Sequence, residues 1–315
     1  MASSLGILLP HRFMSTHAVL TLDDLETWSA PLTPLAVLGH PIKHSISPAM
    51  HNAALAEMAR KDPRFAQWQY VRFDVPPEKL PAALERLHAK GFFGLNLTVP
   101  HKVLACACVA SIDPAAQPIG AVNTLRREGN GWKGFNTDGY GLAMAVRETL
   151  GAELGGSDIL LLGAGGAARG AAVECLQRKC RSLWIANRTA DNLNRLIADL
   201  RPVAEGVALH GFNPAAPPAH LPAGTLVINA TSAGLRPEDP LPIDLRGLPR
   251  PAGVYDMIYN PAETPLLALA RELQLPAANG LSMLIHQGVR ALEIWSGADV
   301  PVAAMRTAAM QAMGR

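Results

Sequence analysis

From residue 35 onward, short apolar runs alternate with turn residues and with segments of helical periodicity. Apolar runs of strand length predict β-strands at 35–38, 69–75, 92–98, 121–126, 132–135, 159–162, 183–186, 207–211, 226–229 and 254–257. Periodic segments predict helices at 48–58, 77–90, 138–150, 281–295 and 300–313. Strands that alternate with helices of this length predict an α/β fold with largely parallel sheets.

A glycine-rich turn follows the purely apolar strand 159–162 and opens a helix. It matches the form G-x-G-x-x-A, in which the glycines let the backbone approach a pyrophosphate and the helix N-terminus faces the phosphate charge. The pattern predicts a Rossmann-like dinucleotide site that uses Gly163, Ala164, Gly165, Gly166 and Ala167. The alternative is a tight strand-to-helix connection with no ligand.

The end of the following strand indicates which dinucleotide binds. An NAD enzyme places Asp or Glu there to accept from the ribose hydroxyls, whereas this chain has Asn187, Arg188 and Thr189. An arginine can pair with a 2′-phosphate, so the pattern favours NADP(H). The alternative is a helix N-cap at Thr189 preceded by a solvated arginine.

Five further polar segments occur mostly at predicted strand ends or helix starts, where ligands bind in open α/β sheets. Together they supply hydroxyls, amides, one ammonium and one carboxylate, a set that suits a small polyhydroxylated molecule. They are 45–48, 96–102, 120–124, 136–139 and 280–287.

Composition narrows the possible functions. The 315 residues are too many for one comfortable core and suit two domains. A net charge of +2 and the lack of a basic run with interleaved aromatics argue against a nucleic-acid partner. No apolar stretch is long and charge-free enough to span a membrane. Four cysteines without metal-ligand spacing predict reduced thiols in a cytoplasmic protein and no metal site.

Eight ordered segments resemble the shikimate dehydrogenase family, which includes shikimate/quinate dehydrogenases, over about residues 34–295. They read N-L-T-V-P-H-K (96–102), G-A-V-N-T (120–124), N-T-D-G (136–139), G-A-G-G-A-A-R-G (163–170), N-R-T (187–189), N-A-T-S (229–232), Y-D-M-I-Y (255–259) and G-L-S-M-L-I-H-Q (280–287). The resemblance implies reversible reduction of 3-dehydroshikimate to shikimate with NADPH, a step of aromatic amino-acid (chorismate) biosynthesis.

The resemblance also implies residue roles. Lys102 and Asp138 would form the catalytic pair, and Ser45 and Ser47 would bind the substrate carboxylate. The substrate's ring hydroxyls and far edge would contact Thr98, Asn123, Gln287 and Tyr259. The nicotinamide side would be lined by Thr231, Ser232, Met257, Gly280 and Met283.

The chemistry of the pair is consistent with ketone reduction. Hydride arriving at a carbonyl carbon leaves an alkoxide that needs a proton, and an ammonium beside that oxygen can supply it. A lysine ammonium is charged at neutral pH, and a carboxylate beside it favours that form. The alternatives are a surface lysine at Lys102 and a helix N-cap at Asp138.

The expected organisation is a substrate-binding domain at 32–136 plus 280–315 and a Rossmann-like NADP domain at 137–279, with a cleft that closes over both ligands. Residues 1–31 are expected to be a poorly ordered extension with a short helix near 22–28. We expect a monomer or homodimer. Two other functions stay open: an NAD-dependent quinate or quinate/shikimate dehydrogenase, and a non-catalytic sensor of a cyclohexane carboxylate.

Overall fold

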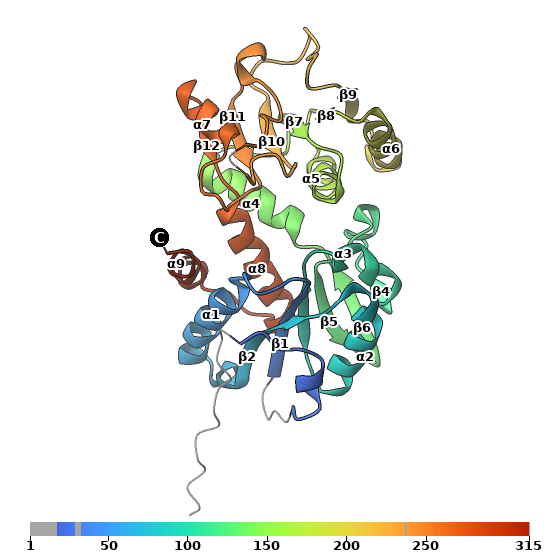
Figure 1. Ribbon diagram of the computed structural model, residues 1–315, viewed down its shortest axis with the longest axis vertical. Coiled ribbons are helices and arrows are strands. Elements are labelled where there is room, and N and C mark those ends of the chain that lie inside the picture. The colour runs from blue at the N-terminus through green and yellow to red at the C-terminus, as the bar shows by residue number, and fades with distance from the viewer. Residues whose placement is uncertain (1–17, 29–32, 237, 315) are drawn as a thin grey trace, which may run out of the picture.

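The computed structural model describes residues 18–28, 33–236 and 238–314 of the chain. Two six-stranded sheets form two lobes at opposite ends of the long axis, and helices α4 (Asp138–Leu150) and α8 (Leu281–Ser296) run between them (Figure 1). The predicted α/β fold class is confirmed. The backbones of α4 and α8 approach closely at Gly141, where an added Cβ would lie 2.7 Å from the Met283 carbonyl oxygen.

The first lobe is built on a sheet of strand order β2-β1-β3-β5-β6-β4. β1, β2 and β3 are parallel, whereas β5 and β6 form an antiparallel hairpin, so this sheet is less parallel than expected. Its strands are β1 (Thr33–Gly39), β2 (Trp68–Asp74), β3 (Gly94–Leu97), β4 (Ser111–Ile112), β5 (Thr124–Glu128) and β6 (Gly131–Phe135).

The second lobe is built on a fully parallel sheet of order β12-β11-β10-β7-β8-β9. Read from β9, this is the 3-2-1-4-5-6 order of the doubly wound dinucleotide-binding fold, whose ligands bind where the order reverses, here between β7 and β10. Its strands are β7 (Asp158–Leu162), β8 (Ser182–Ala186), β9 (Ala208–Phe212), β10 (Leu226–Asn229), β11 (Gly253–Asp256) and β12 (Ala277–Ala278).

Helices cover both faces of each sheet. In the first lobe α2 packs on one face and α1, α8 and α9 on the other; in the second, α4, α5 and α6 share one core and α7 lies in the opposite one. The bounds of the remaining helices are α1 (Ser47–Lys61), α2 (Leu80–Ala89), α3 (His101–Leu104), α5 (Gly166–Gln177), α6 (Ala190–Leu200), α7 (Pro265–Glu272) and α9 (Val302–Ala312).

The described part of the N-terminal extension is folded onto the first lobe, contrary to expectation. Leu20 bridges to Phe73 beside β2, and its N–H and carbonyl bond to Arg72 and Asp74. Leu25 is fully buried in the core that α2 covers, within a 3₁₀ turn at Asp23–Leu25. Burial of these leucines holds the segment on the lobe although it also carries three acidic residues, Asp23, Asp24 and Glu26. The rest of the expected extension, 1–17 and 29–31, lies outside the described residues.

Candidate active site

A cavity of about 410 Å³ opens between the two lobes. It collects most of the predicted substrate-side residues and several predicted for the nicotinamide side: Ser45, Ser47, Thr98, Lys102, Asp138, Met257, Tyr259, Gly280, Met283 and Gln287. The polar groups come from the loop after β1 and the start of α1, the end of β3 and the adjoining α3, the start of α4, the segment after β11 and the first turns of α8. Polar groups from several separate chain segments therefore converge on one space, as expected of a site for a small polar ligand.

The centre of the site is an ion pair between Lys102 on α3 and Asp138 at the start of α4, with Nζ 2.6 Å from Oδ2. Both side chains are partly exposed, at 30% and 24%, so a ligand can reach them. α4 begins at Asp138 and Thr137 precedes it as the N-cap residue, so Asp138 does not cap the helix. Its charge instead lies in the first turn, where a carboxylate interacts favourably with the helix dipole.

Asn123 lies just behind the cavity and links the pair to the polar wall. Its Nδ2 donates to Asp138 Oδ1 at 2.9 Å and approaches Gln287 Oε1 at 3.4 Å. The Asn123 Oδ1 atom accepts from the Thr137 backbone N–H at 2.8 Å and from the Thr124 hydroxyl at 3.0 Å. Because these donors occupy Oδ1, the Asn123 NH₂ group must face Asp138.

The far wall of the cavity is shaped by tight backbone packing. A Cβ on Gly280 would lie 2.1 Å from the Met257 carbonyl oxygen, so only glycine fits beside that loop. The Met283 N–H donates to the phenol oxygen of buried Tyr255 at 3.2 Å, which fixes the start of α8. Burial raises the pKa of the Tyr259 phenol, which keeps that group protonated and able to donate at neutral pH.

The glycine-rich turn lines a second cavity of about 260 Å³ in the second lobe. Gly163 has φ +110°, a conformation that favours glycine. An added Cβ on Gly165 would meet nothing within 4 Å, so the backbone there faces open space that a phosphate could fill. The predicted residues in this wall are Gly163, Ala164, Gly165, Asn187, Arg188, Thr231 and Ser232.

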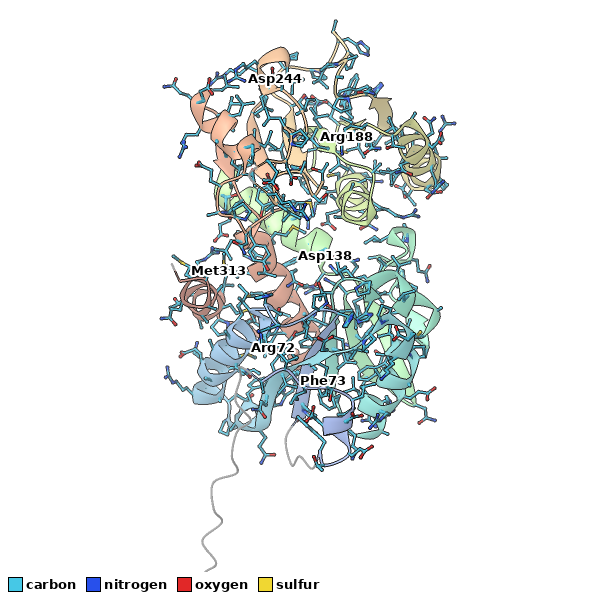
Figure 2. The ribbon with its side chains drawn as sticks, viewed as in Figure 1. Arg72, Phe73, Asp138, Arg188, Asp244 and Met313 are labelled. Atoms are coloured by element: carbon cyan, nitrogen blue, oxygen red, sulfur yellow. The ribbon has the colours of Figure 1, made fainter. Side chains whose placement is uncertain are left out.

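Arg188 stands at the edge of this cavity, well within the second lobe (Figure 2). It forms no ion pair with any acid in the part of the chain that the structure describes. Thr189 is the one predicted cofactor residue that lines neither these two cavities nor the third one described below. It precedes α6 as the N-cap residue, and its carbonyl accepts from Asn187 Nδ2 at 2.8 Å.

A third cavity of about 410 Å³ shares four lining residues with the first and follows the second along the glycine-rich turn, from Gly165 to Gly166. Gly166 and Ala167 line it from the second lobe, and Val99 and Val103 from the first. Lys102, Asp138, Met257 and Met283 border both this cavity and the first one. Asp138 indeed lies at the junction of the lobes (Figure 2). A long ligand could therefore run from Arg188 past the glycine turn to the ion pair.

The residues around the turn fit a dinucleotide. The turn offers a glycine backbone with open space, the N-terminus of the twelve-residue helix α5 and a cation without an acidic partner among the described residues. A buried hydrogen-bond network supports the part of the second cavity's wall that contains Thr231. In it, Asp256 accepts from Asn229 Nδ2 at 3.0 Å and from the Thr264 hydroxyl at 2.7 Å. Asn229 in turn accepts from the Thr231 hydroxyl at 2.7 Å.

Comparison with known proteins gives consistent matches. The model of the shikimate dehydrogenase substrate binding domain matches residues 37–125, and that of the shikimate 5′-dehydrogenase C-terminal domain matches residues 280–310. The shikimate dehydrogenase (NADP(+)) of Symbiobacterium thermophilum is 40% identical over 294 residues, covering 91% of this chain and 97% of that protein. The chain belongs to the shikimate dehydrogenase family. The predicted family is confirmed.

Solved structures extend the comparison. Shikimate 5-dehydrogenase from Thermus thermophilus, in complex with NADP(H) and shikimate, is 33% identical with a TM-score of 0.76, covering 89% of this chain and all of that chain. The 5-ketofructose reductase of Gluconobacter sp. strain CHM43 is 29% identical with a TM-score of 0.80, covering 90% and 99%. The shikimate dehydrogenase fold therefore also occurs with another ketone substrate.

Two residues that line the cavities of this shikimate dehydrogenase family member were not predicted individually from the sequence. Asn96 lines the first cavity and accepts the Tyr70 hydroxyl at 2.7 Å, and Asn136 lines the third. Asn96 and Thr98 are two residues apart at the end of a strand and so share a face, a pattern that could have identified Asn96. No group of three potential metal ligands and no helix able to cross a membrane occurs within residues 18–28, 33–236 and 238–314.

Proposed function

We propose that this protein catalyses the reversible, NADP-dependent reduction of 3-dehydroshikimate to shikimate. The observation that carries the proposal is the Lys102–Asp138 pair, which borders both the polar cavity and the cleft leading to the glycine turn. A charged proton donor at that junction can reach a substrate oxygen in the polar cavity. Family membership at 40% identity over most of the chain supports the same reaction.

The substrate is proposed to lie in the first cavity. Ser45 and Ser47 would bind its carboxylate by hydroxyl and backbone donors, and Thr98, Asn123 and Gln287 would bind the ring hydroxyls. Tyr259 would donate from the far edge. Support comes from the placement of all but Asn123 in the wall of one cavity, with Asn123 hydrogen-bonded to Asp138.

The cofactor is proposed to span the second and third cavities. When bound, NADPH supplies the hydride. Gly163, Ala164, Gly165, Gly166 and Ala167 would hold the pyrophosphate through backbone amides, and Asn187, Arg188 and Thr189 the adenosine phosphate. Thr231, Ser232, Met257, Gly280 and Met283 would line the nicotinamide side.

Lys102 and Asp138 would divide the proton chemistry between them. In reduction, the Lys102 ammonium gives its proton to the oxygen that becomes the ring hydroxyl, and in oxidation neutral lysine takes that proton back. Asp138 fixes Lys102 Nζ with one oxygen while Asn123 occupies the other. Because oxidation of shikimate releases a proton, we expect a rise in pH to favour oxidation.

We also propose the domain division suggested by the sequence, with substrate binding by 32–136 plus 280–315 and cofactor binding by 137–279. Each sheet falls within one of these units, and α4 and α8 begin close to the boundaries. The four cysteines are free, which supports a reducing compartment such as the cytoplasm. We propose a monomer or homodimer that has no nucleic-acid partner.

The deciding experiment is a nicotinamide absorbance assay on the purified protein, with shikimate, quinate and the reduced form of 5-ketofructose each crossed with NADP⁺ and NAD⁺. We expect strong turnover only with shikimate and NADP⁺. Turnover with quinate and NAD⁺ would keep the Lys102–Asp138 chemistry and overturn the substrate and cofactor. Turnover of only the sugar, which lacks a carboxylate, would overturn the roles of Ser45 and Ser47. Tight NADPH binding without any turnover would favour the sensor.

A further inference from the structure

The loop between β1 and α1 carries Ser45 and leads directly into Ser47, but has little structure of its own. Within the loop, the Ser45 N–H donates to the Ile42 carbonyl at 3.0 Å, and the Ser47 N–H to the Ser45 hydroxyl at 3.4 Å. Neither bond involves the carbonyl of Lys43 or of Ser45. The position of the two serine hydroxyls therefore depends on contacts that other elements make with this loop.

Arg72 makes two of those contacts. It lies on β2 next to Val37 of β1, is 9% exposed, and lies outside the cavity lining. Its Nη1 donates to the Lys43 carbonyl at 2.8 Å and to the Ser45 carbonyl at 3.0 Å. Hydrogen bonds from a charged donor are stronger than those from a neutral one, and the planar guanidinium fixes the direction of these two bonds.

The other side of the same guanidinium meets the N-terminal segment. Arg72 Nε donates to the Ala18 carbonyl at 3.3 Å, and the Arg72 carbonyl accepts from the Leu20 N–H at 3.0 Å. Leu20 and Leu25 are buried in the core beneath Phe73, the residue after Arg72. Arg72 and Phe73 lie side by side at the first sheet (Figure 2). The segment therefore holds Arg72 from the side opposite the serine loop.

We propose that Arg72 is a positioning residue for the carboxylate-binding serines, and that the segment around Ala18 and Leu20 fastens it. Arg72 donates to the backbone of the serine loop and thereby sets where the hydroxyls of Ser45 and Ser47 stand. The inference rests on the proposed function, because it assumes that these serines bind the substrate carboxylate.

The test compares Arg72→Met with wild type in steady-state kinetics on the full chain. We expect the KM for shikimate to rise roughly tenfold or more, the scale of a charge-assisted hydrogen bond, with kcat changed less than about threefold and the KM for NADP⁺ unchanged. With shikimate methyl ester, which lacks the carboxylate charge, the ratio of variant to wild-type KM should fall toward one. Arg60→Met, an exposed arginine paired with Glu57, is the matched control and should leave all constants unchanged.

Two further variants keep the test decisive. Arg72→Lys retains the charge but loses the planar fork, and we expect an intermediate KM even if the methionine variant folds poorly. In the double variant Arg72→Met/Ser45→Ala, the penalties should be less than multiplicative, because both act on one contact. An unchanged KM for shikimate, or an equal rise for shikimate, its ester and NADP⁺, would overturn the positioning role. Absence of shikimate turnover in the wild type would overturn the proposed function instead.

Discussion

Asp138 uses both carboxylate oxygens at once, one for Lys102 and one for Asn123. This arrangement leaves the Lys102 ammonium facing the cavity on its remaining side. Lys102→Met removes the proton donor and leaves the cofactor walls intact. We expect turnover to fall about 10²–10⁴-fold, the usual contribution of general acid–base catalysis, while NADPH still binds with near-wild-type affinity.

Two measurements check this prediction: kcat by nicotinamide absorbance and NADPH affinity by fluorescence titration. Lys133→Met is the control, since Lys133 also pairs with an acid of the first lobe, Asp113, at 3.7 Å but lines none of the three cavities. Near-normal turnover in Lys102→Met would remove Lys102 from the chemistry.

His51 is a buried group that the proposed chemistry does not use. Its ring stacks on Tyr70 with 4.0 Å between centroids, and its Nδ1 lies 3.0 Å from the Ser47 carbonyl oxygen. Burial lowers its pKa from 6.5 to about 4. Between these two values the unfolded chain binds a proton that the folded protein does not, so stability must fall as the pH drops below 6.5.

We expect this histidine to remove about 2 kcal/mol of unfolding free energy between pH 6.5 and 5, and His51→Phe to abolish that part of the loss. Urea unfolding of both proteins at pH 7 and pH 5 measures it. His101, whose pKa burial also lowers, is present in both proteins and cancels in the difference. Equal losses in wild type and variant would show that His51 binds its proton as readily in the folded protein as in the unfolded chain.

Site residues could be predicted from the sequence where they belong to a motif. They could be predicted less well where only the fold brings them to the site. Lys102, Asp138 and Gly163 stand in motifs, and the structure brings them to cavity walls. Asn96 and Arg72 are ordinary strand residues in the sequence. Only the neighbours supplied by folding, Tyr70 for Asn96 and the serine loop for Arg72, reveal a connection to the site.

At the scale of elements, the contact between α4 and α8 joins the two lobes. A Cβ at Gly141 would lie 2.7 Å from the Met283 carbonyl oxygen and 2.9 Å from the Gln287 amide nitrogen, both backbone atoms. Gly141→Ala must therefore separate the helices. We expect a loss of about 1–3 kcal/mol, as for overpacked cores, and a lower kcat/KM because Met283 and Gln287 line the site.

Thermal or urea unfolding together with kinetics tests the helix contact. Gly247→Ala is the control, because an added Cβ there meets nothing within 4 Å and the backbone is not left-handed. A Gly141→Ala protein as stable and active as wild type would mean that the two helices can move apart without cost.

Long elements could be predicted well because local chemistry and packing agree. α4 runs from Asp138 to Leu150 as predicted, and Gly151 with φ +62° ends it. The two-residue strands β4 and β12 carry no periodicity and exist only through their neighbours β6 and β11. The segment 18–28 likewise shows only three spaced leucines, whose burial depends on a sheet formed by later residues.

At the scale of the whole molecule, the glycine motif predicted a dinucleotide fold, and the order of the second sheet bears this out. What no motif could supply is the meeting of the first and third cavities at Lys102, Asp138, Met257 and Met283. That junction depends on the angle between two lobes. The angle is set by the α4–α8 contact and, on the other side, by Arg169 of α5, whose Nη2 donates to the Pro118 carbonyl at 3.3 Å.

The third cavity has an apolar rim that closure of the lobes would cover. Val103 of α3 lines it and is 61% exposed, opposite Gly166 and Ala167 at the start of α5. Burying a valine side chain contributes about 1.5 kcal/mol, or roughly tenfold in a closure equilibrium. We therefore expect Val103→Asn to lower kcat/KM by up to about tenfold with little change in thermal stability, because this valine is mostly exposed without ligands.

Leu104→Asn is the matched control, because Leu104 is also exposed, at 45%, but lines none of the three cavities. Small-angle scattering should show that NADP⁺ and shikimate together reduce the radius of gyration of wild type and of Leu104→Asn more than that of Val103→Asn. If all three proteins compact equally, closure does not bury Val103. If none compacts, the lobes already stand at their catalytic angle, and the apolar rim must be covered by the nicotinamide end of the cofactor rather than by the opposite lobe.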